Sequence, residues 1–378
     1  MIGGFYGNIL NNNISISIII LVLAALLGLY ITRSFHKFQF IKDIEKKSRL
    51  LSWCVASIPV IILIIIGIWY FMYSLVIELH LALMFFVCDI IWSIVKKCFK
   101  LKIKAYVAGI SAIIITGCYF SYGWVNAHNV VETDYNITSD KLEKNEKLKI
   151  IQITDSHIGT TFSGESFGDY IDKILQQNPD VVVVTGDFVD GSTSYEDMVN
   201  ACKSLGKAIS KYGVYYIFGN HDLHNYGGNP YYSTDEFVNE LKKNNVHILQ
   251  DETVMVGDKF YITGRQDATV HDRKSTEELL AALDKSHYIV LLDHQPLEYS
   301  EADKAGADLL LSGHTHGGQI FPLAYMNRLV SKNEMVYGIK ETGRTTCIVS
   351  SGISEWGFAF RTGCKSEYVV INVNGEKY

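Results

Sequence analysis

The sequence has no Cys-x-x-Cys pair, although it contains seven cysteines. Zinc-finger spacing is therefore absent, and structural zinc sites of that kind are excluded. The cysteines up to residue 118 lie in or beside apolar segments, which is typical of small buried residues. Cys347 and Cys364 could instead form one disulfide, and the sequence leaves these two alternatives open.

A basic surface is missing from the second part of the chain. The first 128 residues carry eleven Lys or Arg and four Asp or Glu, whereas the remaining residues carry 23 basic and 36 acidic groups. Nucleic-acid binding requires a basic face that neutralises phosphates. The charge balance therefore argues against a nucleic acid as partner.

The chain also has no internal repeat and no low-complexity segment.

The segment before the first apolar run has no basic residue, which disfavours a cleavable signal peptide. The apolar runs 14–32 and 103–124 are each long enough to cross a bilayer, which takes about 20 residues. The apolar stretch 50–95 would make a helix about twice as long as the hydrocarbon core is thick, so it should cross twice. We therefore predict a transmembrane region over residues 1–125 with four helices, at about 14–32, 50–73, 75–95 and 103–124.

Two basic clusters predict how this region is oriented. Six Lys or Arg lie between Arg33 and Arg49, and five lysines lie between Lys96 and Lys104. Positive loops stay in the cytoplasm, so both clusters should lie there, with two crossings between them. The N-terminus is then outside, and the fourth helix carries residues 126–378 to the extracytoplasmic side. We expect a multi-pass integral membrane protein.

Two acidic residues, Glu78 and Asp89, fall inside the third predicted helix, about three turns apart and on one face. A carboxylate near the middle of a bilayer costs about 2.5–3.5 kcal/mol on insertion scales, so Asp89 should face the interior of the bundle. The two residues could contact a substrate or ion. Alternatively, they form hydrogen bonds between helices, or Glu78 lies close to the outer interface.

The second part of the chain has the pattern of an α/β domain. Residues 126–147 form a polar linker with an edge strand at 130–135, and β-branched runs then alternate with helical patterns, which predicts a parallel or mixed sheet. The predicted strands are 148–154, 181–185, 214–218, 253–256, 259–263, 287–292, 309–312, 346–350 and 367–373. The predicted helices are 167–177, 195–211, 234–244 and 275–283. The strand-rich end predicts a second sheet packed on the first.

Metal-ligating residue types recur in short loops after these strands, most of them bounded by glycine. The loops are Asp155-Ser-His157, Gly186-Asp187-Phe-Val-Asp190, Gly219-Asn220-His221-Asp222, His294 before Gln295-Pro296, and Gly313-His314-Thr-His316. Carboxylate, imidazole and amide groups suit a pair of divalent cations of borderline hardness. Loops at strand ends can converge at one edge of a sheet. The sequence therefore predicts a hydrolase with two metal ions.

The order of these loops resembles the calcineurin-like metallophosphoesterase family. The gaps are 32 residues from Asp155 to Asp187 and 33 from Asp187 to Asn220, and the resemblance covers roughly residues 148–375 of a domain predicted at 148–378. The stretches 312–320 and 349–352 are similar to its membrane-anchored branch. Ser366-Glu367 stands where that branch commonly has a Pro-Glu pair. This difference involves no metal ligand. The resemblance implies a four-layer α/β/β/α sandwich after the transmembrane region.

The resemblance also implies roles for individual residues. The first metal would be held by Asp155, His157 and His316, the second by Asn220, His294 and His314, and both by Asp187. Two ions bridged in this way can share a water whose pKa falls far enough to give a hydroxide nucleophile near neutral pH. His221 would contact the phosphoryl group or protonate the leaving alkoxide, while Asp222 would orient the His221 ring and raise its pKa. Asp190 would hold a ligand in position.

Two further polar residues carry weaker predictions. His224 could line the substrate cleft or belong to a solvated loop. Arg265 could contact a phosphate or form a surface ion pair. The ligand types accept Mn²⁺, Fe, Zn²⁺ or Co²⁺, so the identity of the metals is open.

The predicted function is a membrane-anchored, metal-dependent phosphoesterase that hydrolyses a phosphate ester, diester or pyrophosphate, with lipid-linked substrates among the candidates. Tethering beside the bilayer would raise the effective concentration of such substrates. The first alternative is a membrane receptor or accessory protein in which the domain only binds. The second makes the helices a transport path, for which four helices without a broken-helix repeat are a weak basis. The sequence leaves the substrate and the oligomeric state open.

Overall fold

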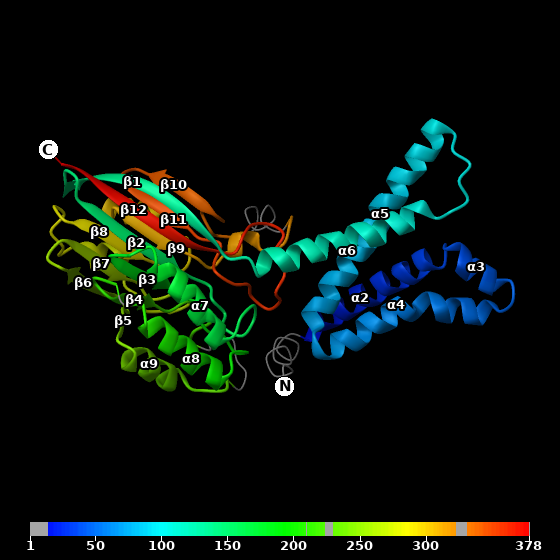
Figure 1. Ribbon diagram of the computed structural model, residues 1–378, viewed down its shortest axis with the longest axis horizontal. Helices are drawn as coiled ribbons and strands as arrows, with labels where there is room; N and C mark the ends of the chain where they lie inside the picture. Colours follow the sequence, from blue (N-terminus) through cyan, green and yellow to red (C-terminus); the bar gives the residue numbers. More distant parts are fainter. Residues whose placement is uncertain (1–13, 209, 224–229, 323–330, 378) are drawn as a thin grey trace. The chain divides into compact units, whose positions relative to one another are not determined.

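The computed structural model describes residues 14–208, 210–223, 230–322 and 331–377. The chain divides into two compact units, residues 1–122 and residues 123–378 (Figure 1). His224, one of the predicted cleft residues, lies outside the described residues.

The first unit is helical. It contains α2 (Ile14–Phe35), α3 (Gln39–Glu45), α4 (Arg49–Trp69), α5 (Phe71–Phe99) and most of α6 (Val107–Ala127). All of these except α3 are long and apolar enough to cross a membrane, which matches the four helices predicted. The break between the middle two falls at Tyr70, a few residues earlier than expected, and α5 is correspondingly longer.

Asp89 pairs with polar groups inside this unit. Its Oδ2 atom accepts a hydrogen bond from Lys37 Nζ at 2.6 Å and from Tyr106 OH at 3.1 Å. Lys37 follows the end of α2 and belongs to the first basic cluster. Asp89 therefore bonds to residues just outside α2 and α6, which is in line with the alternative of hydrogen bonds between helices. Glu78 is 7% exposed and packs beside Gly28.

The second unit is built on two six-stranded sheets. The first has the order β1-β12-β2-β3-β4-β5, and the second β10-β11-β9-β8-β7-β6. The strands of the first sheet are β1 (Val131–Glu143), β2 (Lys147–Ile153), β3 (Val181–Thr185), β4 (Val214–Ile217), β5 (Val246–Ile248) and β12 (Glu367–Lys377). Those of the second are β6 (Glu252–Val256), β7 (Phe260–Gly264), β8 (Tyr288–Leu292), β9 (Leu309–Ser312), β10 (Gly338–Thr342) and β11 (Thr345–Val349).

Both sheets are mixed, and their central strands are parallel. Strands β2 to β5 run parallel, as do β7, β8, β9 and β11. One core fills the space between the sheets, with Ile150 and Val183 from the first and Val290 and Leu311 from the second. These strands are buried on both faces, which explains their near-continuous apolar runs.

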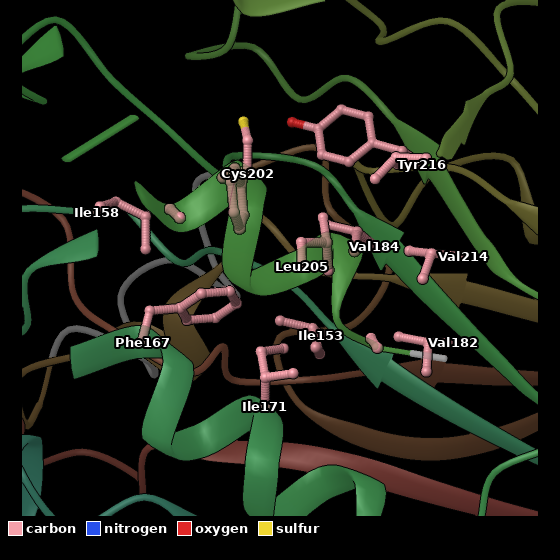
Figure 2. Close-up of a cluster of buried hydrophobic side chains, with 14 of the residues drawn as sticks. Ile153, Ile158, Phe167, Ile171, Val182, Val184, Cys202, Leu205, Val214 and Tyr216 are labelled. Atoms are coloured by element: carbon pink, nitrogen blue, oxygen red, sulfur yellow. The ribbon is translucent and has the colours of Figure 1, made fainter. Parts of the chain in front are cut away.

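Helices cover the outer face of each sheet. Figure 1 shows α7 (Gly164–Leu175), α8 (Tyr195–Gly206) and α9 (Thr234–Lys243) beside the first sheet. In Figure 2, Phe167 of α7 and Leu205 of α8 point toward Val182 and Val184 of β3. On the second sheet, α10 (Thr276–Leu280) and α11 (Tyr299–Ala305) pack against β8, β9 and β11. The predicted four-layer α/β/β/α order is confirmed.

The structure also corrects parts of the sequence interpretation. The predicted linker is mostly strand, because β1 pairs with β12 in parallel from Val131 to Ser139. Neither β5 nor β10 was predicted, since the first has three residues and the second is mostly exposed and polar. The disulfide alternative is wrong, because Cys347 and Cys364 are both free. Cys347 packs into the cluster under α10 and α11.

We expect Ile371→Ala to destabilise the second unit by about 2–5 kcal/mol, because Ile371 is fully buried between the sheets and truncation leaves a cavity. Ile339→Ala is the control, because Ile339 is 43% exposed on β10 and its truncation should change stability by about 0.5 kcal/mol or less. Thermal unfolding of the detergent-solubilised protein measures both. Equal shifts for the two variants would contradict the described core.

Candidate metal centre

The metal-ligating side chains follow the carboxyl ends of parallel strands from both sheets. Asp155, Asp187 and Asn220 come after β2, β3 and β4 of the first sheet. His294 and His314 come after β8 and β9 of the second. Parallel neighbours end at the same edge, so these loops meet in one place. Packing of the two sheets therefore brings the loops of both within contact distance.

The first group consists of Asp155, His157 and His316. One ligand atom from each lies within 4.8 Å of the others, and all three residues are buried. His316 Nε2 is 3.5 Å from Asp155 Oδ1. This group can hold one metal ion.

The second group consists of Asp187, His294 and His314, whose ligand atoms also lie within 4.8 Å of one another. Asp187 Oδ2 is 3.1 Å from His294 Nε2 and 3.7 Å from His157 Nε2, so this carboxylate faces both groups. Asn220 Oδ1 lies 3.2 Å from His294 Nε2 and 2.9 Å from His314 Nδ1. The predicted residues after five different strands thus converge.

The other ring nitrogens have partners that set the tautomers. His294 Nδ1 lies 2.7 Å from Thr185 O, and His316 Nδ1 lies 3.2 Å from Ser354 O. A carbonyl oxygen only accepts, so each Nδ1 carries a proton, and Nε2 is the nitrogen that a neutral ring can offer to a metal. His157 Nδ1 is held by Asp190 Oδ2 at 3.1 Å, and its buried Nε2 has no hydrogen-bond partner. A buried lone pair aimed at carboxylates fits a cation.

Charge in the centre concentrates on Asp187. Burial alone would raise the pKa of its carboxyl, but His294 and His221 hold that pKa well below its ordinary value. Burial and the neighbouring His294 lower the pKa of His314 to about 4. Burial, followed by the charges of His157 and Arg361, lowers the pKa of His316 well below its ordinary value. Burial would lower the pKa of His294, but Asp187 raises it well above its ordinary value, so this ring must release a proton before its Nε2 can bind a metal.

Glycine is required where ligand loops cross. A Cβ at Gly186 would lie 2.5 Å from Gly219 N, and Gly186 has a φ of 91°. A Cβ at Gly219 would collide with the carboxylate of Asp187, and one at Gly313 with the carboxylate of Asp155. The ligands themselves also have left-handed backbone. The φ values are 52° at Asp155, 35° at His157, 51° at Asp187, 71° at His314 and 49° at His316.

Comparisons with known proteins agree with this geometry. The family model described as calcineurin-like phosphoesterase matches residues 148–318. An uncharacterized metallophosphoesterase from Campylobacter jejuni is 33% identical over 276 residues, which cover 70% of each chain. The chain belongs to the calcineurin-like metallophosphoesterase family. The predicted family is therefore confirmed.

A second relative and one solved structure of similar fold match a smaller share of this metallophosphoesterase. A Bos taurus transmembrane protein with metallophosphoesterase domain is 31% identical over 240 residues, 58% of this chain and 51% of the relative. Among solved structures, a dimetal phosphatase from Danio rerio is 11% identical, covers 53% of this chain and 86% of its own, and has a TM-score of 0.37. That likeness is too weak to carry an argument.

Asp222 binds backbone amides of the ligand loops in this metallophosphoesterase, which the sequence did not predict. Its Oδ2 accepts hydrogen bonds from the backbone N–H of Asp187 at 2.8 Å and of Gly219 at 2.7 Å. Its Oδ1 accepts from two further amides after β3. Asp222 therefore ties two ligand loops together. Burial lowers the pKa of His221 below its ordinary value, so the rise expected from Asp222 does not prevail.

Arg265 is buried and held inside the protein. Its Nη1 donates to Asp293 Oδ2 at 3.2 Å and to Glu298 Oε2 at 2.6 Å. The ion-pair alternative therefore describes it better than a phosphate contact, although the pair is buried and not on the surface. Sequence reasoning missed the buried pair of Glu355 and Arg361, which lies in the loop behind His316. The available signal was a pair of charged residues, Glu355 and Arg361, within the otherwise uncharged stretch 350–364.

We expect Asp187→Asn to abolish binding of two metal ions, because an amide removes the negative charge that faces both groups. The loss of affinity should be at least the about 10- to 100-fold that follows removal of a residue behind a ligand. Calorimetric titration with MnCl₂ measures it. Asp169→Asn is the control, since Asp169 is exposed on α7. Binding of two ions with unchanged affinity by Asp187→Asn would contradict this interpretation of the centre.

Proposed function

We propose that this chain is a membrane-anchored, metal-dependent phosphoesterase that hydrolyses a phosphate ester, diester or pyrophosphate. The observation that supports it most directly is the position of Asp187 between two groups of ligand atoms. Membership of the metallophosphoesterase family supports the same reaction class.

The proposal assigns the ligands as follows. Asp155, His157 and His316 hold the first ion, Asn220, His294 and His314 hold the second, and Asp187 contacts both. Nitrogen and oxygen ligands of this kind suit Mn²⁺, Fe, Zn²⁺ or Co²⁺. When bound, such a pair of ions stabilises the charge that develops on the phosphoryl oxygens and lowers the pKa of a coordinated water.

The remaining residues bind and orient the substrate. His221 and His314 are half-buried, whereas His157 and His294 are fully buried, so substrate approaches from the side of His221. The His221 ring lies 5.1 Å from the ring of His157 and 5.5 Å from that of Trp356 between centroids. We assign His221 the contact with the phosphoryl group or the protonation of the leaving oxygen.

Asp222 and Asp190 act as positioning residues in this proposal. Asp222 fixes the backbone of Asp187 and Gly219 through hydrogen bonds, and Asp190 fixes the ring of His157. Residues that orient ligands in this way tune metal affinity without contacting the substrate.

A binding-only role is the alternative. It would be favoured by the loss of a ligand or of His221, and the described residues contain all of them. Hydrolysis is therefore the better proposal.

The four candidate membrane helices and the two basic clusters support an extracytoplasmic location for the phosphoesterase domain. Substrates that reside in or on the membrane, such as lipid-linked phosphodiesters or pyrophosphates, would then meet the site at high effective concentration.

Purified full-length protein in detergent should hydrolyse p-nitrophenyl phosphate or bis-p-nitrophenyl phosphate with Mn²⁺ and not with EDTA. We expect His221→Ala to lower turnover by about 10²–10⁴-fold, the range for loss of a general acid, while still binding two ions. His271→Ala is the control, because His271 is exposed and distant in sequence from the ligand loops. Two bound ions without turnover of either ester would favour the binding role or a substrate presented only in a membrane.

Fusions to alkaline phosphatase test the orientation. Alkaline phosphatase becomes active only outside the cytoplasm. A fusion after residue 378 should therefore be active, and a fusion after Lys102, in the second basic cluster, should be inactive. Green fluorescent protein at the same two positions should give the reverse pattern. The opposite result would place the catalytic domain in the cytoplasm.

A further inference from the structure

A buried ion pair lies behind the first metal group and takes no part in the proposed reaction. Arg361 Nε donates to Glu355 Oε1 at 2.6 Å, and both side chains are fully buried. They belong to the loop 350–366, which joins β11 to β12. Removing two charges from water is costly, so such a pair calls for a structural or functional reason.

The loop 350–366 contacts two of the three ligands in the first group. Ser354 N donates to Asp155 O at 3.2 Å, and Ser354 O lies 3.2 Å from His316 Nδ1. A Cβ at Gly352 would lie 2.7 Å from Asp155 Cβ, so the loop packs directly on that residue. The position of Ser354 O therefore decides which way the His316 ring presents Nε2.

Arg361 holds this carbonyl in place. Its Nη2 donates to Ser354 O at 2.5 Å, the same oxygen that faces His316. Its Nη1 donates to Ser351 O and to Lys365 O, both at 2.7 Å. A planar guanidinium with several fixed donors sets the geometry of all the groups it bonds. Glu355 orients the guanidinium and is itself held by Ser366 Oγ at 2.8 Å.

The last turn of α6, Gly123–Ala127, belongs to the second unit and is bonded to the same loop. Asn126 Nδ2 donates to Arg361 O at 2.9 Å and to Cys364 O at 2.6 Å. Arg361 N donates to Gly123 O at 3.0 Å, and Ser366 Oγ reaches Ala127 O at 2.9 Å. The hydroxyl of Ser366 thus lies between the helix end and Glu355, a contact that proline could not make.

We propose that the last turn of α6 is a positioning element of the first metal group, with Asn126 as its principal side chain. The contacts run from Asn126 to Arg361, from Arg361 to Ser354 O, and from there to His316. This inference rests on the proposed metal centre and concerns metal affinity, which is measured without any substrate. A fragment that begins at residue 128 would lack the whole element.

The test is a calorimetric titration of the full-length Asn126→Asp protein in detergent with MnCl₂. A carboxylate keeps the size of the side chain but replaces the donor group with an acceptor that faces two carbonyl oxygens. We expect one of the two ions to bind about 10- to 100-fold more weakly, as when a residue behind a ligand is lost. The binding curve should resemble that of His316→Ala, and the melting temperature in EDTA should stay close to that of the wild type.

Asn129→Ala is the matched control, since Asn129 is exposed just beyond the helix and should bind both ions as the wild type does. Unchanged affinities in Asn126→Asp would overturn the proposal. So would loss of both ions together with a large fall in the melting temperature in EDTA, because that indicates a general structural role. Wild-type protein that binds fewer than two ions would overturn it as well. If the wild type binds two ions but hydrolyses neither ester, that result counts against the proposed function alone, and the ion affinities still decide the positioning role.

Discussion

The carboxylate of Asp187 is the contact on which the arrangement of the centre depends. It belongs to the first sheet, yet it lies 3.1 Å from His294 of the second sheet, and its Oδ1 accepts the backbone N–H of His221. This carboxylate can reach both sheets only because their inner faces share one core and their parallel strands end at the same edge. The four-layer fold therefore serves to bring two sets of loops to one charged group.

Several features of the sequence follow from this convergence. Backbone atoms of two loops and the carboxylates of Asp187 and Asp155 occupy the space where a Cβ would lie, so glycine precedes Asp187, Asn220 and His314. Asp222 bonds the amides of two of these loops, which keeps them at a fixed separation. The ligands themselves are held from behind by carbonyl oxygens, such as Thr185 O on His294, and by the Asp190 carboxylate on His157.

Much of this organisation could be predicted from the sequence, because some patterns have a single physical explanation. The β-branched run Val181–Thr185 predicts a buried strand, and the structure shows this strand fully buried. Asp187 lies two residues after it. Other features depend on partners distant in the chain. The exposed strand β10 has no apolar pattern, and the partners of Asp222 are backbone amides that no residue type reveals. The link from Asn126 to Arg361 joins residues 235 positions apart, which spacing alone cannot indicate.

Five of the candidate ligands have a left-handed backbone, which lowers the stability of the fold. A residue other than glycine costs about 1–2 kcal/mol of stability in that conformation. Asp costs less, because its short polar side chain can form a local hydrogen bond. Glycine at Asp155 or His314 would relax the backbone and at the same time delete a ligand. Substitutions that stabilise these loops therefore tend to remove candidate metal ligands. The stability that the strained loops cost must come from the buried apolar side chains on both faces of the sheets.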